Sequence, residues 1–167
     1  MQDGILILVS VWFIGGHLFA AANDTLHMRI PNALILYLLG GFAVTVALSK
    51  PDWADLAASA AVGIAVFAGG MVLFARGWMG GGDVKLLAVS GLWLGPLATP
   101  ALLLLTALAG GVLTLALIVL RTLGTHRLAD SRIATLRDPM ARVPYGIAIA
   151  TAAIAVAFLR PEALSMG

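Results

Sequence analysis

The 167-residue sequence contains no cysteine and few charged residues. Without cysteine it can form neither a disulfide nor a thiolate metal site, and its three histidines, His17, His27 and His126, lack the spacing of metal ligands. Charged residues are 11% of the chain, against about a quarter in a typical soluble domain. So few charges cannot cover a water-exposed surface, which argues against a soluble protein.

Apolar residues are abundant instead. They make up 61% of the chain, and the mean hydropathy is +1.03. The net charge of +2 comes from only ten Lys and Arg residues, which are scattered among apolar runs rather than gathered in a basic patch. We therefore predict no nucleic-acid partner, and we interpret the basic residues as signals of membrane topology in a chain surrounded by lipids.

Apolar runs of membrane-spanning length recur along the chain. A helix rises about 1.5 Å per residue, so crossing roughly 30 Å of hydrocarbon takes about 20 apolar residues. Residues 4–22, 33–49, 56–75 and 143–159 approximately meet this requirement. The first run has no basic residue before it, so we expect a retained span rather than a signal peptide.

The apolar run over residues 86–120 is 35 residues long, which is too long for one crossing. Gly95-Pro96 and Thr99-Pro100 predict a turn that divides it in two. The first of these spans must then begin near Asp83 to be long enough. The sequence thus predicts an all-α, polytopic membrane protein, a bundle of about six transmembrane helices that forms one domain over residues 1–167.

The basic residues favour this topology. Six spans with the N-terminus outside place eight Lys and Arg residues in the cytoplasm and two outside, as the positive-inside rule requires. A single span over residues 86–120 would give four inside and six outside. Asp24 follows the first span and Asp83 follows the third, so both acids are expected at the cytoplasmic face in either topology.

Asp24 belongs to a polar segment between the first two predicted spans. Pro31-Asn32 fits a helix start, because Pro lacks an amide hydrogen and Asn can cap free amides. Asp24 has two interpretations that the sequence leaves open. It is either a functional carboxylate or a structural acid, in a loop or as a helix cap, paired with Arg29.

Asp83 follows three glycines, Gly80 to Gly82, at the predicted membrane boundary. A carboxylate there is costly and is usually functional. Glycine permits close backbone approach, so this loop would admit an extended peptide beside the acid. The alternative is structural, with the glycines forming a turn and Asp83 capping the next helix.

Two aspartates on one face suggest a mechanism. Close carboxylates do not both ionise cheaply, so one keeps a proton while the other remains an anion. The anion can activate water, and the acid can polarise a scissile carbonyl and protonate the leaving nitrogen. This chemistry requires neither a metal nor a cofactor.

In three segments the sequence resembles the type IV prepilin peptidases, which are aspartyl peptidases of the GxGD class. The similarity is greatest to the short members that serve tight-adherence (Flp) pili. The matching segments are Asp24 with Ile30-Pro31-Asn32, residues 80–87 (GGGDVKLL) and residues 143–146 (VPYG).

This resemblance implies a prepilin leader peptidase of the inner membrane, with its active site facing the cytoplasm. Asp24 and Asp83 would be the catalytic aspartates, and the substrates would be prepilins or pseudopilins cleaved after a short basic leader. The apolar helix of the prepilin would lie in the bilayer beside the enzyme. Residues expected in the substrate-binding region or its loop are Gly80, Gly82, Lys85, Pro31, Asn32 and Tyr145.

Other interpretations remain. An archaeal-type preflagellin peptidase would share the chemistry, while a small membrane transporter or a non-catalytic pilus assembly subunit would not need it. His17, inside the first span, is expected to be a neutral, hydrogen-bonded helix contact. The four tryptophans are expected to anchor the chain at the membrane interface.

Long members of the resembled family carry an additional cytoplasmic domain with cysteine pairs and also methylate the new N-terminus. This sequence has no cysteine, and we expect no separate methyltransferase or zinc domain. We therefore predict leader cleavage without methylation. Mass spectrometry of the mature pilin N-terminus checks this, and a methylated pilin from cells with no other candidate enzyme would contradict it.

Overall fold

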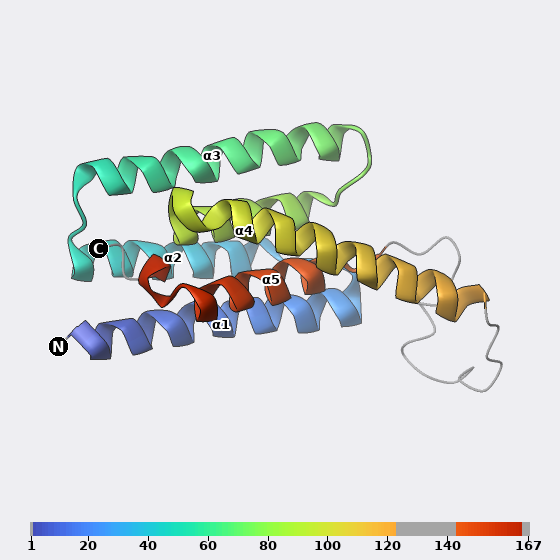
Figure 1. The fold of residues 1–167 in the computed structure, drawn as a ribbon, viewed down its shortest axis with the longest axis horizontal. Coiled ribbons are helices and arrows are strands. Elements are labelled where there is room, and N and C mark those ends of the chain that lie inside the picture. Colours follow the sequence, from blue (N-terminus) through green and yellow to red (C-terminus); the bar gives the residue numbers. More distant parts are fainter. Residues whose placement is uncertain (1, 123–142, 165–167) are drawn as a thin grey trace.

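The computed structural model describes residues 2–122 and 143–164, and these parts of the chain are helical with no strand (Figure 1). This confirms the all-α prediction. The elements are α1 (Gln2–His27), α2 (Asn32–Ser49), α3 (Trp53–Ala75), α4 (Gly81–Thr122), α5 (Tyr145–Leu159) and a 3-10 turn, η3 (Pro161–Leu164).

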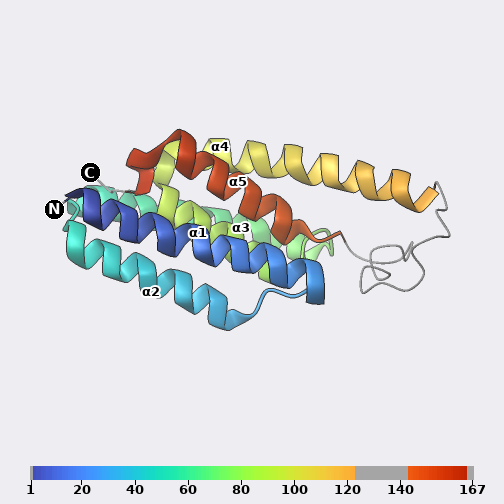
Figure 2. The same ribbon diagram turned by 90° about the horizontal axis from the view of Figure 1, so that it is seen from below.

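The helix α4 is bent back on itself at Gly95. This residue has φ 68° and ψ −176°, a backbone conformation open essentially to glycine alone. Pro96 follows it, and the Thr99 hydroxyl donates a hydrogen bond to the Gly95 carbonyl at 2.7 Å. The two arms of α4 consequently run in opposite directions (Figures 1 and 2). The predicted division of this apolar run is confirmed, with its turn at Gly95.

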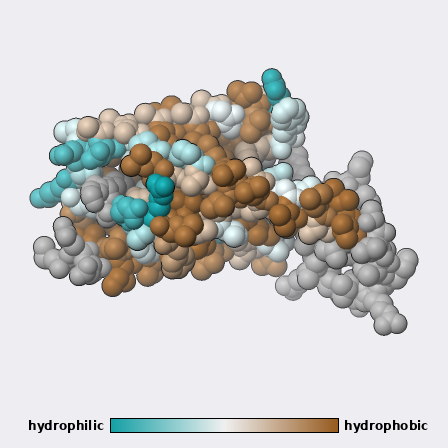
Figure 3. All heavy atoms as spheres, in the orientation of Figure 1, coloured by the Kyte–Doolittle hydropathy of each residue, from teal (hydrophilic) through white to brown (hydrophobic). Residues whose placement is uncertain are grey.

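The helices form a multi-pass membrane protein. Among the described residues, α1, α2, α3 and α4 are long and apolar enough to cross a membrane, whereas α5 is a shorter apolar helix. Its 15 residues correspond to roughly 22 Å, less than the hydrocarbon thickness. Many large apolar side chains remain exposed, as expected of a lipid-facing surface, and Figure 3 shows them over much of the length of the helices.

Packing places α4 against α3 and α5, and α1 against α5 and α2. The core contains Phe13, Leu38, Trp93 and Ile149, all fully or almost fully buried. Trp93 is 1% exposed, and its indole nitrogen donates to the Leu38 carbonyl at 3.0 Å. The expectation that Trp93 anchors the membrane interface is therefore wrong. A partner for the indole N–H inside the bundle allows the whole ring to be buried.

Two neighbouring glycines in α3 differ in what surrounds them. A Cβ on Gly70 would lie 2.7 Å from Cγ1 of Val84 in α4, whereas a Cβ on Gly69 would have nothing within 4 Å. Of these two glycines, Gly70 therefore lies in the contact between α3 and α4, whereas Gly69 faces open space.

We predict that Gly70→Ala destabilises the bundle by about 1–3 kcal/mol, because the added methyl overpacks the contact with Val84. The midpoint of thermal unfolding in detergent measures the effect. Gly69→Ala is the matched control and should leave the midpoint unchanged or raise it, since alanine favours helix. A midpoint for Gly70→Ala at or above that of the control would contradict the packing argument.

Candidate functional site

One cavity brings together the polar segments that the sequence singled out. It lies where α1 ends and α4 begins, and its volume is about 1060 Å³. Asp24 and Asp83 both line it, as do Pro31, Asn32 and Tyr145. Its remaining lining residues are Asn23, His27, Met28, Arg29, Ile30, Phe74, Gly77, Trp78, Met79, Gly80, Gly81, Gly82 and Val143.

Asp24 lies inside α1, one turn before its end, and is only 5% exposed. The helix ends just after it because Met28 adopts a left-handed conformation with φ 52°. The prediction of a loop position for Asp24 is therefore wrong, because the helical segment continues past the apolar run. No ion pair joins Asp24 to Arg29, although the structure describes both residues, so the paired loop acid is also excluded.

The Asp24 carboxylate is held by the start of α5. The Gly146 amide donates a hydrogen bond to Asp24 Oδ2 at 2.7 Å. Amides in the first turn of a helix have no acceptor within the helix, and the helix dipole places partial positive charge there. Asp24 thus satisfies an amide of a distant helix, and that helix end stabilises a carboxylate within an otherwise apolar bundle.

Close approach makes glycine necessary at position 146. A Cβ there would lie 2.7 Å from Asp24 Oδ2 and 2.9 Å from Asp24 Cγ. Reasoning from the sequence did not assign Gly146 a role. The available signal was its place after Pro144-Tyr145 at the start of an apolar run, where a first-turn amide is free.

Asp83 is half-buried in the first turn of α4, so its charge also lies near the favourable end of a helix dipole. Its carboxylate folds back over Gly80, where a Cβ would lie 2.7 Å from Asp83 Oδ2. Gly80 precedes α4, but Gly81 and Gly82 are helical. The expected glycine loop is therefore shorter than predicted, because the helix begins before the acid.

Gly82 allows α4 to approach the segment that precedes α2. A Cβ on Gly82 would lie 3.0 Å from Ile30 Cβ and 3.4 Å from the Ile30 carbonyl oxygen. The two polar segments of the chain therefore touch through this glycine. In the structure Gly82 allows close packing of the two segments at the cavity, and it does not open a loop.

Lys85 links α4 to α2. Its Nζ donates to Asn32 Oδ1 at 2.9 Å, and it stands beside the cavity rather than among the residues that line it. The predicted helix start at Pro31-Asn32 is confirmed, with Pro31 as the N-cap residue of α2, but no side chain caps the helix. The capping interpretation of Asn32 is wrong, because its side-chain oxygen accepts from Lys85 instead.

Tyr145 begins α5, and its ring reaches from the cavity to the returning arm of α4. A Cβ on Gly110 would lie 2.7 Å from Tyr145 Cε1. Pro144 precedes the helix as its N-cap residue, so it starts α5 and does not kink it. Tyr145 thus occupies the wall of the cavity next to the Gly146 amide that holds Asp24.

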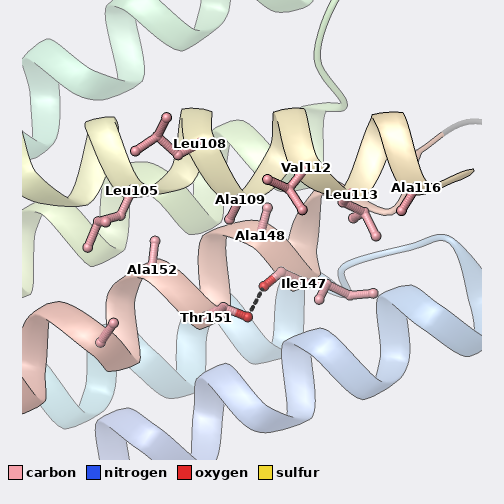
Figure 4. Close-up of a pocket in the computed structure, with 11 residues that line it drawn as sticks. Leu105, Leu108, Ala109, Val112, Leu113, Ala116, Ile147, Ala148, Thr151 and Ala152 are labelled. Carbon is pink, nitrogen blue, oxygen red and sulfur yellow. Dashed lines mark hydrogen bonds between the residues drawn. The ribbon is translucent and has the colours of Figure 1, made fainter.

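A second groove, of about 470 Å³, runs between the returning arm of α4 and α5 (Figure 4). Its lining is apolar apart from Thr151, whose hydroxyl donates to the Ile147 carbonyl. It holds no group for acid–base chemistry, which therefore concentrates in the first cavity. Within residues 2–122 and 143–164 there is no group of three or more His, Cys, Asp or Glu side chains placed to hold a metal ion.

The family model described as the type IV leader peptidase family matches residues 11–115, a range that includes both aspartates. The chain belongs to the type IV leader peptidase family. No curated protein and no solved structure matches it. Membership makes the chain a peptidase of multi-pass membrane type, with prepilin-type substrates. It favours the peptidase interpretation over a transporter or an assembly subunit.

We predict that Gly146→Ala lowers leader cleavage by about 10²-fold, because the added methyl displaces the Asp24 carboxylate while the amide donor remains. Gly111→Ala is the control, since a Cβ there meets nothing within 4 Å. Initial cleavage rates at equal membrane abundance test this. Equal rates for both variants would show that the tight contact at Gly146 does not matter for activity.

Proposed function

We propose that the protein is an aspartic prepilin leader peptidase that cleaves a short basic leader at the cytoplasmic face of the inner membrane, with Asp24 and Asp83 as its catalytic dyad. The observation that carries this proposal is that both aspartates, from separate helices, line one cavity at one end of the bundle. Membership of the leader peptidase family supports the reaction class.

Two carboxyl groups in one cavity supply the chemistry of peptide hydrolysis. In the proposed reaction, the carboxylate of the pair takes a proton from water as the water oxygen attacks the scissile carbonyl carbon. The protonated member donates to the carbonyl oxygen and stabilises the tetrahedral intermediate. Proton transfer to the nitrogen then lets the C–N bond break. The two protonation states belong to the pair and not to one named residue.

The surroundings of the aspartates favour such a pair. Asp24 receives the Gly146 amide at 2.7 Å, and Asp83 lies in the first turn of α4, so each carboxyl group is next to the positive end of a helix dipole. Such fixed dipoles stabilise negative charge without reorganising during the reaction. A cavity of about 1060 Å³ is large among ligand sites and has room for an extended peptide segment.

The position of the cavity supports a substrate anchored in the membrane. It opens where apolar helices end, so a prepilin whose apolar helix lies in the bilayer would present its leader junction at this level. Similarity to the short Flp-type members makes Flp prepilins the substrates that we propose, with Pro31, Asn32, Lys85 and Tyr145 positioned around the leader junction.

We predict that Asp24→Asn and Asp83→Asn each lower cleavage of a co-expressed Flp-type prepilin by about 10²–10⁴-fold, because the amide keeps the size of the side chain but removes its acid–base chemistry. Gel-shift processing at membrane levels matched by blot measures this.

Asp55→Asn is the matched control. Asp55 is an exposed acid in the first turn of α3 and does not line the cavity. The Asp55→Asn variant should cleave the prepilin at the same rate as the unmodified protein. Unimpaired cleavage by both dyad variants would exclude the two-aspartate mechanism while leaving the family assignment intact.

A further inference from the structure

A buried polar contact crosses the apolar core between α1 and α4. His17 and Ser90 are both 0% exposed, and His17 Nε2 lies 2.8 Å from Ser90 Oγ. His17 Nδ1 lies 2.8 Å from the carbonyl oxygen of Phe13, one turn earlier in α1. A carbonyl can only accept, so in the neutral imidazole Nδ1 carries the proton and Nε2 accepts from the Ser90 hydroxyl.

The surroundings of this contact make it specific. The Phe13 ring lies 4.1 Å from the imidazole, centroid to centroid, and 5.4 Å from the Trp93 ring. The single hydroxyl proton of Ser90 is shared between two acceptors, because Ser90 Oγ also donates to the Leu86 carbonyl oxygen of its own helix at 2.8 Å. Both side chains are fully buried, beside the Phe13 ring that packs on Trp93. In such an environment a polar group is strongly bound to the partner that it has.

The spacing along each helix connects this contact to the aspartates. Asp24 lies seven residues after His17, and Asp83 lies seven residues before Ser90. Seven residues are close to two helical turns, about 10.5 Å, so each aspartate shares a helix face with its buried partner. Since α1 and the first arm of α4 run in opposite directions (Figure 2), a register that pairs 17 with 90 brings 24 and 83 to the same level along the two helices.

The neighbouring ring contact agrees with this register. Phe13 is one turn before His17, and Trp93 is about one turn after Ser90, and their rings meet at 5.4 Å. The ring contact is apolar and tolerates small shifts along the helix axis. The hydrogen bond at 2.8 Å has a narrow range of distance and angle, so it sets the register more strictly.

We propose that His17 and Ser90 are positioning residues whose hydrogen bond sets the register of α1 against α4 and thereby the separation of Asp24 and Asp83. The inference rests on the proposed function for its catalytic consequence. Its structural content is independent of that function, because it concerns the distance between two helix positions.

The first arm of the test measures that distance without activity. Because the sequence has no cysteine, Asp24→Cys and Asp83→Cys introduced together form the only thiol pair of the chain. Bismaleimide reagents of increasing length are applied in membranes, and intact-mass analysis identifies the shortest that links the pair. We expect Ser90→Ala and His17→Leu to shift this length or lower the yield severalfold. Ser90→Thr keeps the hydroxyl and should not.

The second arm uses the intact dyad and measures cleavage of a Flp-type prepilin. Ser90→Ala and His17→Leu should lower kcat by about tenfold or more with little change in KM, as expected of a misplaced catalytic group. Ser90→Thr should restore kcat. Thr45→Ala is the matched control, since it removes a buried hydroxyl that donates to the Gly41 carbonyl in its own helix. Thr45→Ala should change neither the crosslinking of the thiol pair nor kcat.

Unchanged crosslinking in Ser90→Ala and His17→Leu would overturn the positioning role, whatever the cleavage result. If cleavage is lost while crosslinking is unchanged, His17 and Ser90 affect activity by a route other than the spacing of the aspartates. If His17→Leu does not accumulate in membranes, Ser90→Ala decides, because it removes a single oxygen atom. Failure of the proposed function is seen separately, as normal cleavage by Asp24→Asn and Asp83→Asn with the crosslinking shift still present.

Discussion

A carboxyl group inside an apolar helix bundle must find hydrogen-bond donors, and the rest of the cavity is arranged around the one that Asp24 finds. The Gly146 amide belongs to the first turn of α5, where it has no acceptor of its own. The contact therefore satisfies two groups that would each be costly to bury alone. It also joins the end of α1 to the start of α5, which fixes one wall of the cavity.

The reversal of α4 supplies the opposite wall. Its first arm begins beside the cavity with Asp83 in the first turn, and its second arm returns after Gly95. Gly110 on the returning arm contacts Tyr145, the residue before the amide that holds Asp24. A single residue with positive φ thus allows α4 to line the cavity with its first arm and to support Tyr145 from behind with its second. Glycines at points of close approach recur there because no other residue leaves the space.

Much of the fold could be predicted from local signals. Composition and the length of apolar runs predicted a polytopic helical protein, and Gly95-Pro96 predicted the turn in α4. The ends of helices were less predictable, since α1 continues past its apolar run to include Asp24. Polar side chains close to a helix end add little to a hydropathy pattern, so that pattern cannot locate the last turn.

Of the candidate site, the sequence pointed to both aspartates and to the segments around them, because charged residues beside long apolar runs are rare and conspicuous. It did not predict the partner of Asp24, the Lys85 contact with Asn32, or the pairing of His17 with Ser90.

The sequence by itself determined the class of protein, its helical segments, the reversal at Gly95 and the presence of two acids at the ends of apolar runs. Those features depend on composition and on neighbours along the chain. Only the tertiary structure decided that Asp24 and Asp83 share one cavity and which groups hold them. Such contacts depend on how each helix is rotated and shifted against helices distant in sequence, and that arrangement results from packing throughout the bundle.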